Sequence, residues 1–260
     1  MKKLNFVVLA VLGLSCGPAF AADDCSKIVA TGHPAYPVIA FKDGDRIAGA
    51  APTLVAAIAK KLDVPLESKA MGSWEEAQQA ARAGTADMIF GIYHNDERAS
   101  YLDYVQPPFM YDDVAVFVAK GKEFPFKDKE DLIGKKGVTN EGESYGNEFD
   151  AFMNDKLEVA RTKGIEAAFE ELLSGKADYL IAGYHPGLAG AASAGLKDKI
   201  VPLDQALLTE EMFVAFSKES PCRSLAPEFG QGITDLTTDG SFDKMLNEAT
   251  AEWDKAQSSK

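Results

Sequence analysis

Short apolar runs alternate with amphipathic stretches through the first part of the chain. Residues 27–31, 66–70 and 87–90 are brief and apolar, as expected of buried strands. Residues 52–62 and 74–82 instead place their apolar side chains at helical spacing, and Pro52 suits the first turn of a helix. Strands that alternate with helices predict a largely parallel sheet covered on both faces, which is an α/β fold.

The alternation continues to the C-terminus. The strands predicted there are 114–118, 136–139, 157–162, 179–182 and 211–217. The helices predicted there are a short one closed by 131–134, one after Gly146 that ends near Asp155, and 165–174, 225–236 and 241–253. A chain of 260 residues with this content suits two units of about 100 residues each.

The first 21 residues have the layout of a secretory signal peptide. Lys2 and Lys3 form a basic start, residues 6–14 form an apolar core, and residues 19–21 form an A-x-A cleavage site. The apolar run is too short for a membrane-spanning helix, and no other stretch approaches that length. We therefore expect the mature chain to be exported.

A lipoprotein is the alternative interpretation of the same segment. Cys16 would carry the lipid, and Ser15 before it is acceptable for that modification. Gly13 stands where such signals prefer leucine, so soluble export is favoured.

The charge of the chain narrows the class of partner. The 27 basic and 40 acidic residues give a net charge of −13, and removal of Lys2 and Lys3 with the signal makes it −15. Nucleic acid and anionic membranes are polyanions, so neither is predicted as a partner. An anionic small ligand remains compatible, because one local arginine can dominate a closed cleft.

A polar loop follows residues 87–90 and ends in Arg98. The loop leaves the carboxyl end of a predicted strand, where open α/β sheets usually place their ligand sites. An arginine there offers a planar fork of donors suited to one carboxylate. Two structural alternatives stay open: a surface arginine that caps the next helix, and a salt bridge to Asp96 or Asp103.

Motifs that surround Arg98 and continue in a fixed order cover essentially the whole mature chain. The motifs are GDRIAG (44–49), WEEAQQAARAGTADMIF (74–90), ER (97–98), DY (103–104), PF (108–109), DLIGKKGV (131–138), ELLSGKADYLIAG (171–183) and TTDGSFDKMLNEATAEW (237–253). Together they resemble the periplasmic solute-binding proteins of polar-amino-acid type, the capture subunits of ABC importers. No single motif is diagnostic, and the ordered series carries the resemblance.

The resemblance implies the fold and the domain organisation. The expected architecture is the type II periplasmic-binding-protein fold: two lobes, each a mainly parallel sheet flanked by helices, joined by two hinge strands. Residues 22–110 and 212–260 would form lobe 1, and residues 111–211 would form lobe 2 with the hinge segments. Two crossings between lobes imply a hinge, with the ligand held between the lobes.

Cys25 and Cys222 are the only cysteines left once the signal is removed. Two cysteines in an exported protein suggest one disulfide. In the topology that the resemblance implies, the N-terminal strand and the C-terminal helices share a lobe, so this pair can meet.

Three first-lobe residues receive ligand-binding roles from the resemblance. Arg98 would hold the ligand carboxylate, and Tyr36 and Trp74 would sandwich the ligand side chain, since aromatic faces supply contact area and attract cations. The structural alternatives are core packing at the helix start for Trp74, and a turn residue between Pro34 and Pro37 for Tyr36.

The second lobe would contribute the loop before its first long helix. Asn140, Glu143 and Ser144 lie in this loop, whose free backbone N–H groups and serine hydroxyl can hold the other carboxylate oxygen. Glu143 would be repelled by an anion, so we expect it to point away or to bind an amine. The alternative is an ordinary capped helix start.

The departures from the family pattern bear on ligand identity. Gly183 stands where relatives that bind free α-amino acids usually place an aspartate for the ammonium group, and His33 replaces an early acid. The loop before Arg98 is one residue short, which leaves Tyr93 or His94 near the usual threonine. The remaining ligand-binding positions are Gly91 and Tyr184.

An ordinary α-amino acid is therefore in doubt as the ligand. Three acids are candidates for the missing ammonium partner, namely Glu141, Glu143 and Asp112. The three histidines, His33, His94 and His185, fall in loops predicted to face the cleft, but their spacing matches no familiar metal motif. We predict no metal and no cofactor, and expect neutral histidines that donate hydrogen bonds to the ligand.

The leading hypothesis is periplasmic capture of a small carboxylate-bearing polar solute by a monomer and its delivery to an ABC permease, not catalysis. An exported cyclohexadienyl (prephenate or arogenate) dehydratase is the enzymatic alternative, with Glu141 or Glu143 as general acid. A ligand-binding module for a signalling partner is the third. No nucleophile–base triad, phosphate loop or dinucleotide fingerprint is recognisable in the sequence.

Overall fold

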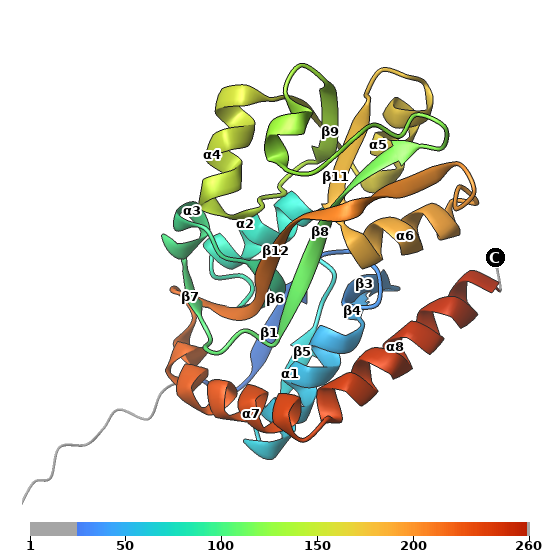
Figure 1. Cartoon of the computed structure of the whole chain (residues 1–260). Helices are drawn as coiled ribbons and strands as arrows, with labels where there is room; N and C mark the ends of the chain where they lie inside the picture. Colours follow the sequence, from blue (N-terminus) through green and yellow to red (C-terminus); the bar gives the residue numbers. More distant parts are fainter. Residues whose placement is uncertain (1–24, 259–260) are drawn as a thin grey trace, which may run out of the picture.

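The computed structural model describes residues 25–258, which form two lobes joined by a pair of long strands (Figure 1). The predicted signal peptide and the alternative lipid site at Cys16 lie outside these residues. Within residues 25–258, no helix combines the length and apolarity needed to cross a membrane. The predicted two-lobed α/β architecture is confirmed.

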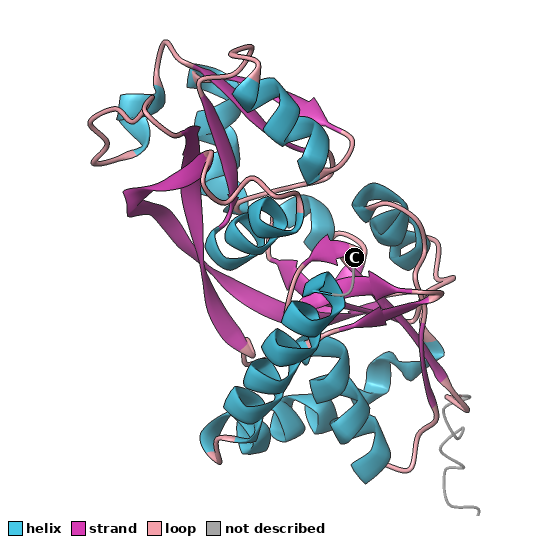
Figure 2. Cartoon of the chain, turned by 90° about the vertical axis from the view of Figure 1, so that its right-hand side faces the viewer, coloured by secondary structure: helices cyan, strands magenta, loops and turns pink. Residues whose placement is uncertain are grey.

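The first lobe, in the lower half of Figure 1, is built from both ends of the described chain. Its strands are β1 (Ile28–Gly32), β5 (Leu66–Ser68), β6 (Met88–Tyr93) and β7 (Leu102–Tyr104), with a small separate sheet of β2 (Ala35–Tyr36), β3 (Ala40–Asp43) and β4 (Arg46–Ala48). Its helices are α1 (Ala50–Lys61), α2 (Trp74–Arg82), α3 (Asp96–Ala99), η2 (Pro221–Leu225), α7 (Ala226–Thr238) and α8 (Ser241–Ser258). Helix α8 packs against α1 and α7 (Figure 1). Figure 2, turned by 90°, shows that helices flank the strands in both lobes.

The second lobe is one continuous stretch of chain between the two long strands. These strands are β8 (Met110–Ala119) and β12 (Ile200–Ser217). The elements between them are η1 (Lys129–Leu132), β9 (Lys136–Asn140), α4 (Gly146–Lys156), β10 (Glu158–Thr162), α5 (Ile165–Leu173), β11 (Tyr179–Gly183) and α6 (Tyr184–Ser193).

One nine-stranded sheet runs through both lobes. Its order is β10-β9-β11-β8-β12-β6-β1-β5, with β7 also paired to β12. The outer strands are parallel within each lobe, whereas β8 and β12 are antiparallel to each other and to their outer neighbours. The expected pair of sheets is therefore a single sheet whose central pair of strands links the lobes.

Strand β12 is much longer than the predicted strand at residues 211–217. It begins at Ile200 and pairs with β8 through register shifts between Pro202 and Leu208. The sequence pattern misses this part because Pro202 and Asp204 interrupt the apolar alternation. The added length takes β12 across both lobes.

Strand β6 is buried on both faces, which explains its continuous apolar sequence. Ile89 packs with Trp74 and Ala77 of α2, whereas Met88 and Phe90 belong to the main core cluster that also contains residues of α1 and α7. Helix α2 has the predicted bounds, and Ser73 begins it with a capping box. These contacts fix the loop that follows β6.

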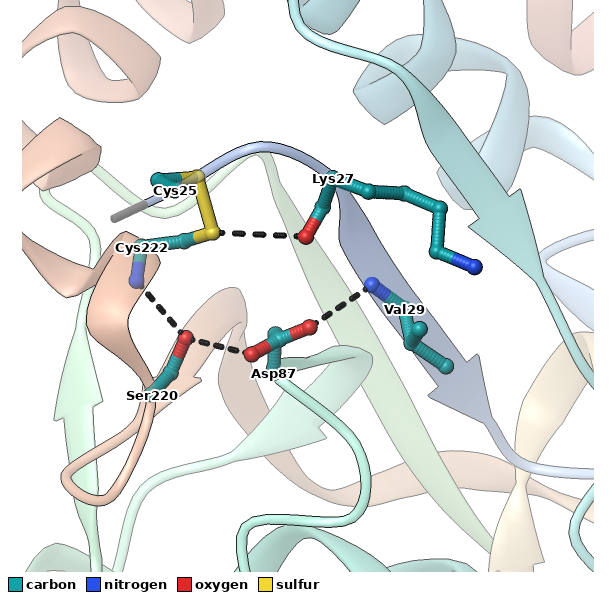
Figure 3. Close-up of a disulfide and its surroundings, with 6 residues drawn as sticks. All are labelled: Cys25, Lys27, Val29, Asp87, Ser220 and Cys222. Carbon is teal, nitrogen blue, oxygen red and sulfur yellow. Dashed lines mark hydrogen bonds between the residues drawn. A yellow bond between two sulfur atoms is a disulfide. The ribbon is translucent and has the colours of Figure 1, made fainter. Parts of the chain in front are cut away.

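A disulfide joins Cys25, at the start of the described chain, to Cys222 in η2, as predicted. Figure 3 shows that Asp87 links the same region by accepting hydrogen bonds from Val29 N (2.8 Å) and Ser220 Oγ (2.7 Å). Ser220 Oγ in turn accepts a bond from Cys222 N at 3.0 Å. Asp87 thus joins β1 to the segment that carries Cys222.

Candidate functional site

Arg98 is buried where the two lobes meet. The loop after β6 places it in the short helix α3, whose N-cap Asn95 accepts a hydrogen bond from Arg98 N at 2.7 Å. Only 2% of Arg98 is exposed, so the surface-arginine alternative is excluded. Within the described chain no carboxylate lies within 4.0 Å of it, because Asp103 is paired with Arg223 and Asp96 bonds to Asn147.

The guanidinium of Arg98 donates to three neutral oxygens. Arg98 Nε donates to Gln78 Oε1 (3.0 Å), Nη1 to Tyr93 O (3.1 Å), and Nη2 to Gly142 O of the second lobe (3.0 Å). Its Cζ also lies 5.6 Å from the ring centroid of Trp74. Arg98 therefore connects α2, β6 and the second lobe directly.

Gln78 is a site residue that the sequence analysis did not identify. It lies one helical turn after Trp74 on the buried face of α2, and its Nε2 donates to Gly142 O at 3.1 Å. Its Oε1 accepts the bond from Arg98 Nε. A polar residue on the apolar stripe of this helix was the available signal.

Further hydrogen bonds join α3 to the segment from Ser144 to Asn147. Asn95 Nδ2 donates to Ser144 Oγ at 2.6 Å, and Ser144 Oγ donates to Asp150. Asp96 N donates to Asn147 Oδ1 (3.0 Å) while Asn147 Nδ2 donates to Asp96 Oδ1 (2.9 Å). The hydroxyl predicted to hold a ligand carboxylate is therefore bound to protein groups here.

Glu143 points into the interface, where it meets His33. His33 Nδ1 accepts a bond from Ala35 N at 2.9 Å, so the neutral ring carries its proton on Nε2 and donates it to Glu143 Oε1 at 3.1 Å. Burial raises the pKa of Glu143, but the hydrogen bond from His33 and the positive charge of Arg98 act against it, and the pKa lies below its usual value. Glu143 is thus a carboxylate that points into the junction and not away from it, and its predicted pairing with a ligand amine stays a prediction.

Tyr36, Tyr93 and Asp112 form a buried cluster beside this pair. The two hydroxyl oxygens lie 2.6 Å apart, and both donate to Asp112 Oδ2, at 2.5 and 2.6 Å. Burial raises the pKa of both phenols, and it raises the pKa of Asp112 although the two hydrogen bonds act the other way. The cluster joins lobe 1 to the hinge strand β8.

Gly183 faces this cluster from the second lobe. A Cβ at this position would lie 2.0 Å from Tyr36 Oη and 3.3 Å from Asp112 Oδ2. An aspartate cannot fit here while Tyr36 occupies the space. Asp112, one of the three acids considered above, nevertheless places a carboxylate close to the same point.

The enclosed space between the lobes is small. A cavity of about 20 Å³ is bounded by His33, Tyr36, Asn140, Glu143 and Gly183 among the predicted site residues. That volume holds about one water molecule. A groove of about 480 Å³ runs along the outside of the same contact, lined in part by Gln78, Arg98, Gly142 and Ser144. Lobe separation is therefore needed to admit a larger molecule.

Comparison of the chain with models of protein families identifies its family. The model of the bacterial extracellular solute-binding proteins, family 3, matches residues 28–251. The chain belongs to this family. As a family 3 solute-binding protein it has the expected two-lobed fold, with the contacts above at the junction of its lobes.

Relatives of this family 3 protein are distant in sequence and similar in fold. The probable amino-acid-binding protein YxeM of Bacillus subtilis (strain 168) is 22% identical over 254 residues, which cover 94% of each chain. The arginine-bound AbpA of Streptococcus pneumoniae, an amino acid ABC transporter substrate-binding protein, has a TM-score of 0.72 at 21% identity, covering 88% of this chain and 96% of AbpA. A histidine kinase sensor domain similar to periplasmic binding proteins has a TM-score of 0.72 at 24% identity, covering 89% and 97%.

Several predicted positions of this family 3 protein lie away from the cavity. His94 is exposed, and its ring centroid lies 4.7 Å from that of Tyr104. His185 is exposed in the first turn of α6 and lines a separate hollow with Asp112, so only His33 among the histidines bounds the small cavity. Tyr184 begins α6 with its ring 5.2 Å from His185. Gly91 has a φ of +74° at the register shift of β6, so its role is to form a bulge.

Proposed function

We propose that the protein binds a small polar solute that carries a carboxylate, an amino acid or a related compound, between its two lobes. The observation that supports this most strongly is Arg98, which is 2% exposed and donates only to neutral oxygens. A buried cation without an anionic partner is costly, so its environment favours an anionic group. A solute carboxylate supplies that group when the lobes separate.

Acidic groups at the junction of the lobes favour a solute that also carries an amine. Glu143 is ionised, and Asp112 lies on the hinge strand near Gly183. Two relatives agree with this chemistry, since YxeM is a probable amino-acid-binding protein and AbpA was solved with L-arginine. We infer that the ammonium group is met by a different acid from the aspartate that relatives place at position 183.

The experiment that tests this proposal is a thermal-shift and calorimetric screen of amino acids, amines and small organic acids. We expect a hit to lose at least about tenfold in affinity in Arg98→Lys, which keeps the charge but not the planar fork. Arg82→Lys is the matched control, because Arg82 pairs with Glu97 near the surface. Equal affinity in Arg98→Lys and wild type would contradict the role of Arg98.

We further propose that the chain works in the periplasm as a monomer and delivers its solute to an ABC permease. The support is the family, the A-x-A site at residues 19–21 and the hinge pair β8 and β12. We propose that residues 22–110 and 212–260 form lobe 1 and that residues 111–211 form lobe 2 with the hinge segments. Export predicts a mature chain that begins at Ala22, which N-terminal sequencing checks, and delivery predicts that solute uptake falls when the gene is deleted.

A sensory module is the second candidate, because one similar structure is a histidine kinase sensor domain. A sensor would leave solute uptake unchanged on deletion and would abolish a transcriptional response instead. The dehydratase alternative is weaker. A general acid works best with a pKa near the working pH, whereas the pKa of Glu143 is lowered. Release of phenylpyruvate from prephenate would revive it.

A further inference from the structure

The backbone carbonyl of Gly142 is held by two donors from the opposite lobe. Arg98 Nη2 lies 3.0 Å and Gln78 Nε2 lies 3.1 Å from this oxygen. The two side chains also bond to each other, from Arg98 Nε to Gln78 Oε1 at 3.0 Å. Both are buried, with 2% and 6% exposure. Arg98 and Gln78 therefore act as one oxygen-binding unit, which we call the cradle.

Gly142 O, which occupies the cradle, is a weaker hydrogen-bond acceptor than the carboxylate that the cradle favours. A guanidinium forms its strongest hydrogen bonds with a carboxylate, and a peptide carbonyl is neutral. The indole N–H of Trp74 is a further donor at this place: Trp74 is 3% exposed, its Nε1 has no acceptor within the described chain, and its Cδ1 lies 3.3 Å from the position of a Cβ on Gly142. A carboxylate has a second oxygen that such a donor can bind.

The loop that carries Gly142 is also bonded to lobe 1 through the two residues that follow it. Glu143 accepts the bond from His33, and Ser144 accepts a bond from Asn95. Asn147 adds two bonds to Asp96 just beyond the loop. The segment from Asn140 to Asn147, which we call the latch, thus holds the lobes together without a bridging molecule between them.

We propose that Gln78 is a solute-binding residue which shares one oxygen with Arg98, and that the latch is a built-in competitor whose Gly142 carbonyl a solute carboxylate must displace. The part that concerns the solute rests on the proposed function. The part that concerns the latch does not, since it requires only that the lobes close through these bonds. The latch also sets a threshold, because a solute that offers only a neutral carbonyl gains no hydrogen-bond strength over the Gly142 carbonyl that it would replace.

The latch is tested by electron–electron distance measurements on the mature chain with no solute added. Spin labels are attached at Lys60→Cys in α1 and Lys156→Cys in α4, which are exposed and lie in different lobes. We expect wild type to be predominantly closed. Gln78→Glu keeps an acceptor for Arg98 Nε but presents a carboxylate instead of a donor to Gly142 O, so the closed-to-open ratio should fall about tenfold.

Matched variants separate this effect from general damage to helix α2. Gln79→Glu changes the adjacent, exposed residue and should leave the distances unchanged. Asn147→Ala removes two latch bonds away from the cradle and, combined with Gln78→Glu, should make the open form predominant. An open wild type, or a double variant as closed as wild type, overturns the latch, whereas failure of every solute to bind would overturn the proposed function alone.

The role of Gln78 in solute binding has a separate test. The indole ¹H–¹⁵N resonance of Trp74, assigned with Trp253→Phe, is followed during titration with L-arginine and with its amide, which lacks the carboxylate. We expect L-arginine to shift this resonance, the amide not to, and Gln78→Leu to weaken the shift about tenfold. Equal response to both compounds, or an unchanged response in Gln78→Leu, overturns the role of the cradle.

Discussion

Gly183 of the second lobe and Tyr36 of the first lobe fit together as a pair. A Cβ on Gly183 would come within 2.0 Å of Tyr36 Oη. The φ of Gly183 is −55°, which any residue adopts, so the neighbouring phenol and not the backbone conformation requires a glycine. The contact of Gly183 with Tyr36 is therefore part of the buried cluster that also contains Tyr93 and Asp112.

Substitution at this contact should therefore be costly and partly reversible. We expect Gly183→Ala to lower the free energy of unfolding by about 1–3 kcal/mol, because the added methyl group overpacks the junction. Tyr36→Phe removes the hydroxyl and should recover part of that loss in the double variant. A double-mutant cycle from urea unfolding measures the coupling, and simple additivity of the two changes would contradict the contact.

The disulfide between Cys25 and Cys222 should stabilise the protein substantially. The bonded residues are separated by 197 positions, so the bridge restricts the unfolded chain strongly. We expect the Cys25→Ser/Cys222→Ser variant to lose about 2–5 kcal/mol of unfolding free energy, as measured by urea denaturation. Wild type with reductant should match the variant, and the variant itself should not respond to reductant.

Glu210 gives the stability a dependence on pH. Burial, with the charges of Asp150 and Glu211, raises the pKa of Glu210 from 4.5 to about 7. The folded protein therefore binds the proton of Glu210 more tightly than the unfolded chain does. The free energy of unfolding falls as the pH rises from 4.5 to about 7, and the loss is complete above that range. Glu210→Gln should therefore be as stable as wild type near pH 4 and more stable at pH 8.

Thermal unfolding of both proteins between pH 4 and pH 8 tests this prediction. Glu158→Gln alters an exposed glutamate on β10, another strand of the second lobe, and serves as the control. A difference between wild type and Glu210→Gln that stays constant over the whole range would exclude the titration of Glu210 as its cause.

Trp74 should report lobe separation by its fluorescence. It is 3% exposed in the closed junction, whereas the only other tryptophan, Trp253, lies on α8 against Phe41. In a Trp253→Phe background, we expect the emission of Trp74 to move to longer wavelength in Asn147→Ala combined with Gln78→Glu, because opening exposes the ring to water. An unchanged spectrum in a variant shown to be open would place Trp74 outside the moving interface.

Elements with strong local patterns could be predicted from the sequence, and elements fixed by distant contacts could not. Helix α2 has the predicted bounds because its apolar stripe and its Ser73 cap agree. Helix α6 was missed because Pro186, Gly187 and Gly190 are poor helix formers. Its glycines serve tertiary packing instead: a Cβ on Gly187 would lie 2.3 Å from Phe117, a residue 70 positions away.

The candidate site shows the same division. The resemblance identified Arg98, and Tyr36, Trp74, His33 and Glu143 do lie at the junction of the lobes. Their partners were not predictable, because the carbonyl of Gly142 is a backbone group that every residue possesses. Gln78 needed the fold to bring α2 against the second lobe. Asp112 was a candidate acid in the sequence, but its place near Gly183 needed the pairing of β8 with β11.

The antiparallel pairing of β8 and β12 places Asp113 directly opposite Thr209, so the chain enters and leaves the upper half of the molecule at adjacent points. The second lobe can therefore be exchanged as a unit, because it is connected to the rest of the chain only through β8 and β12. A corresponding segment from another member of the family could be transplanted between these two residues, while the termini and the disulfide stay in place. Such chimaeras would combine the junction residues of one lobe with those of a different partner lobe. Recombination of the same segments during evolution could change solute preference.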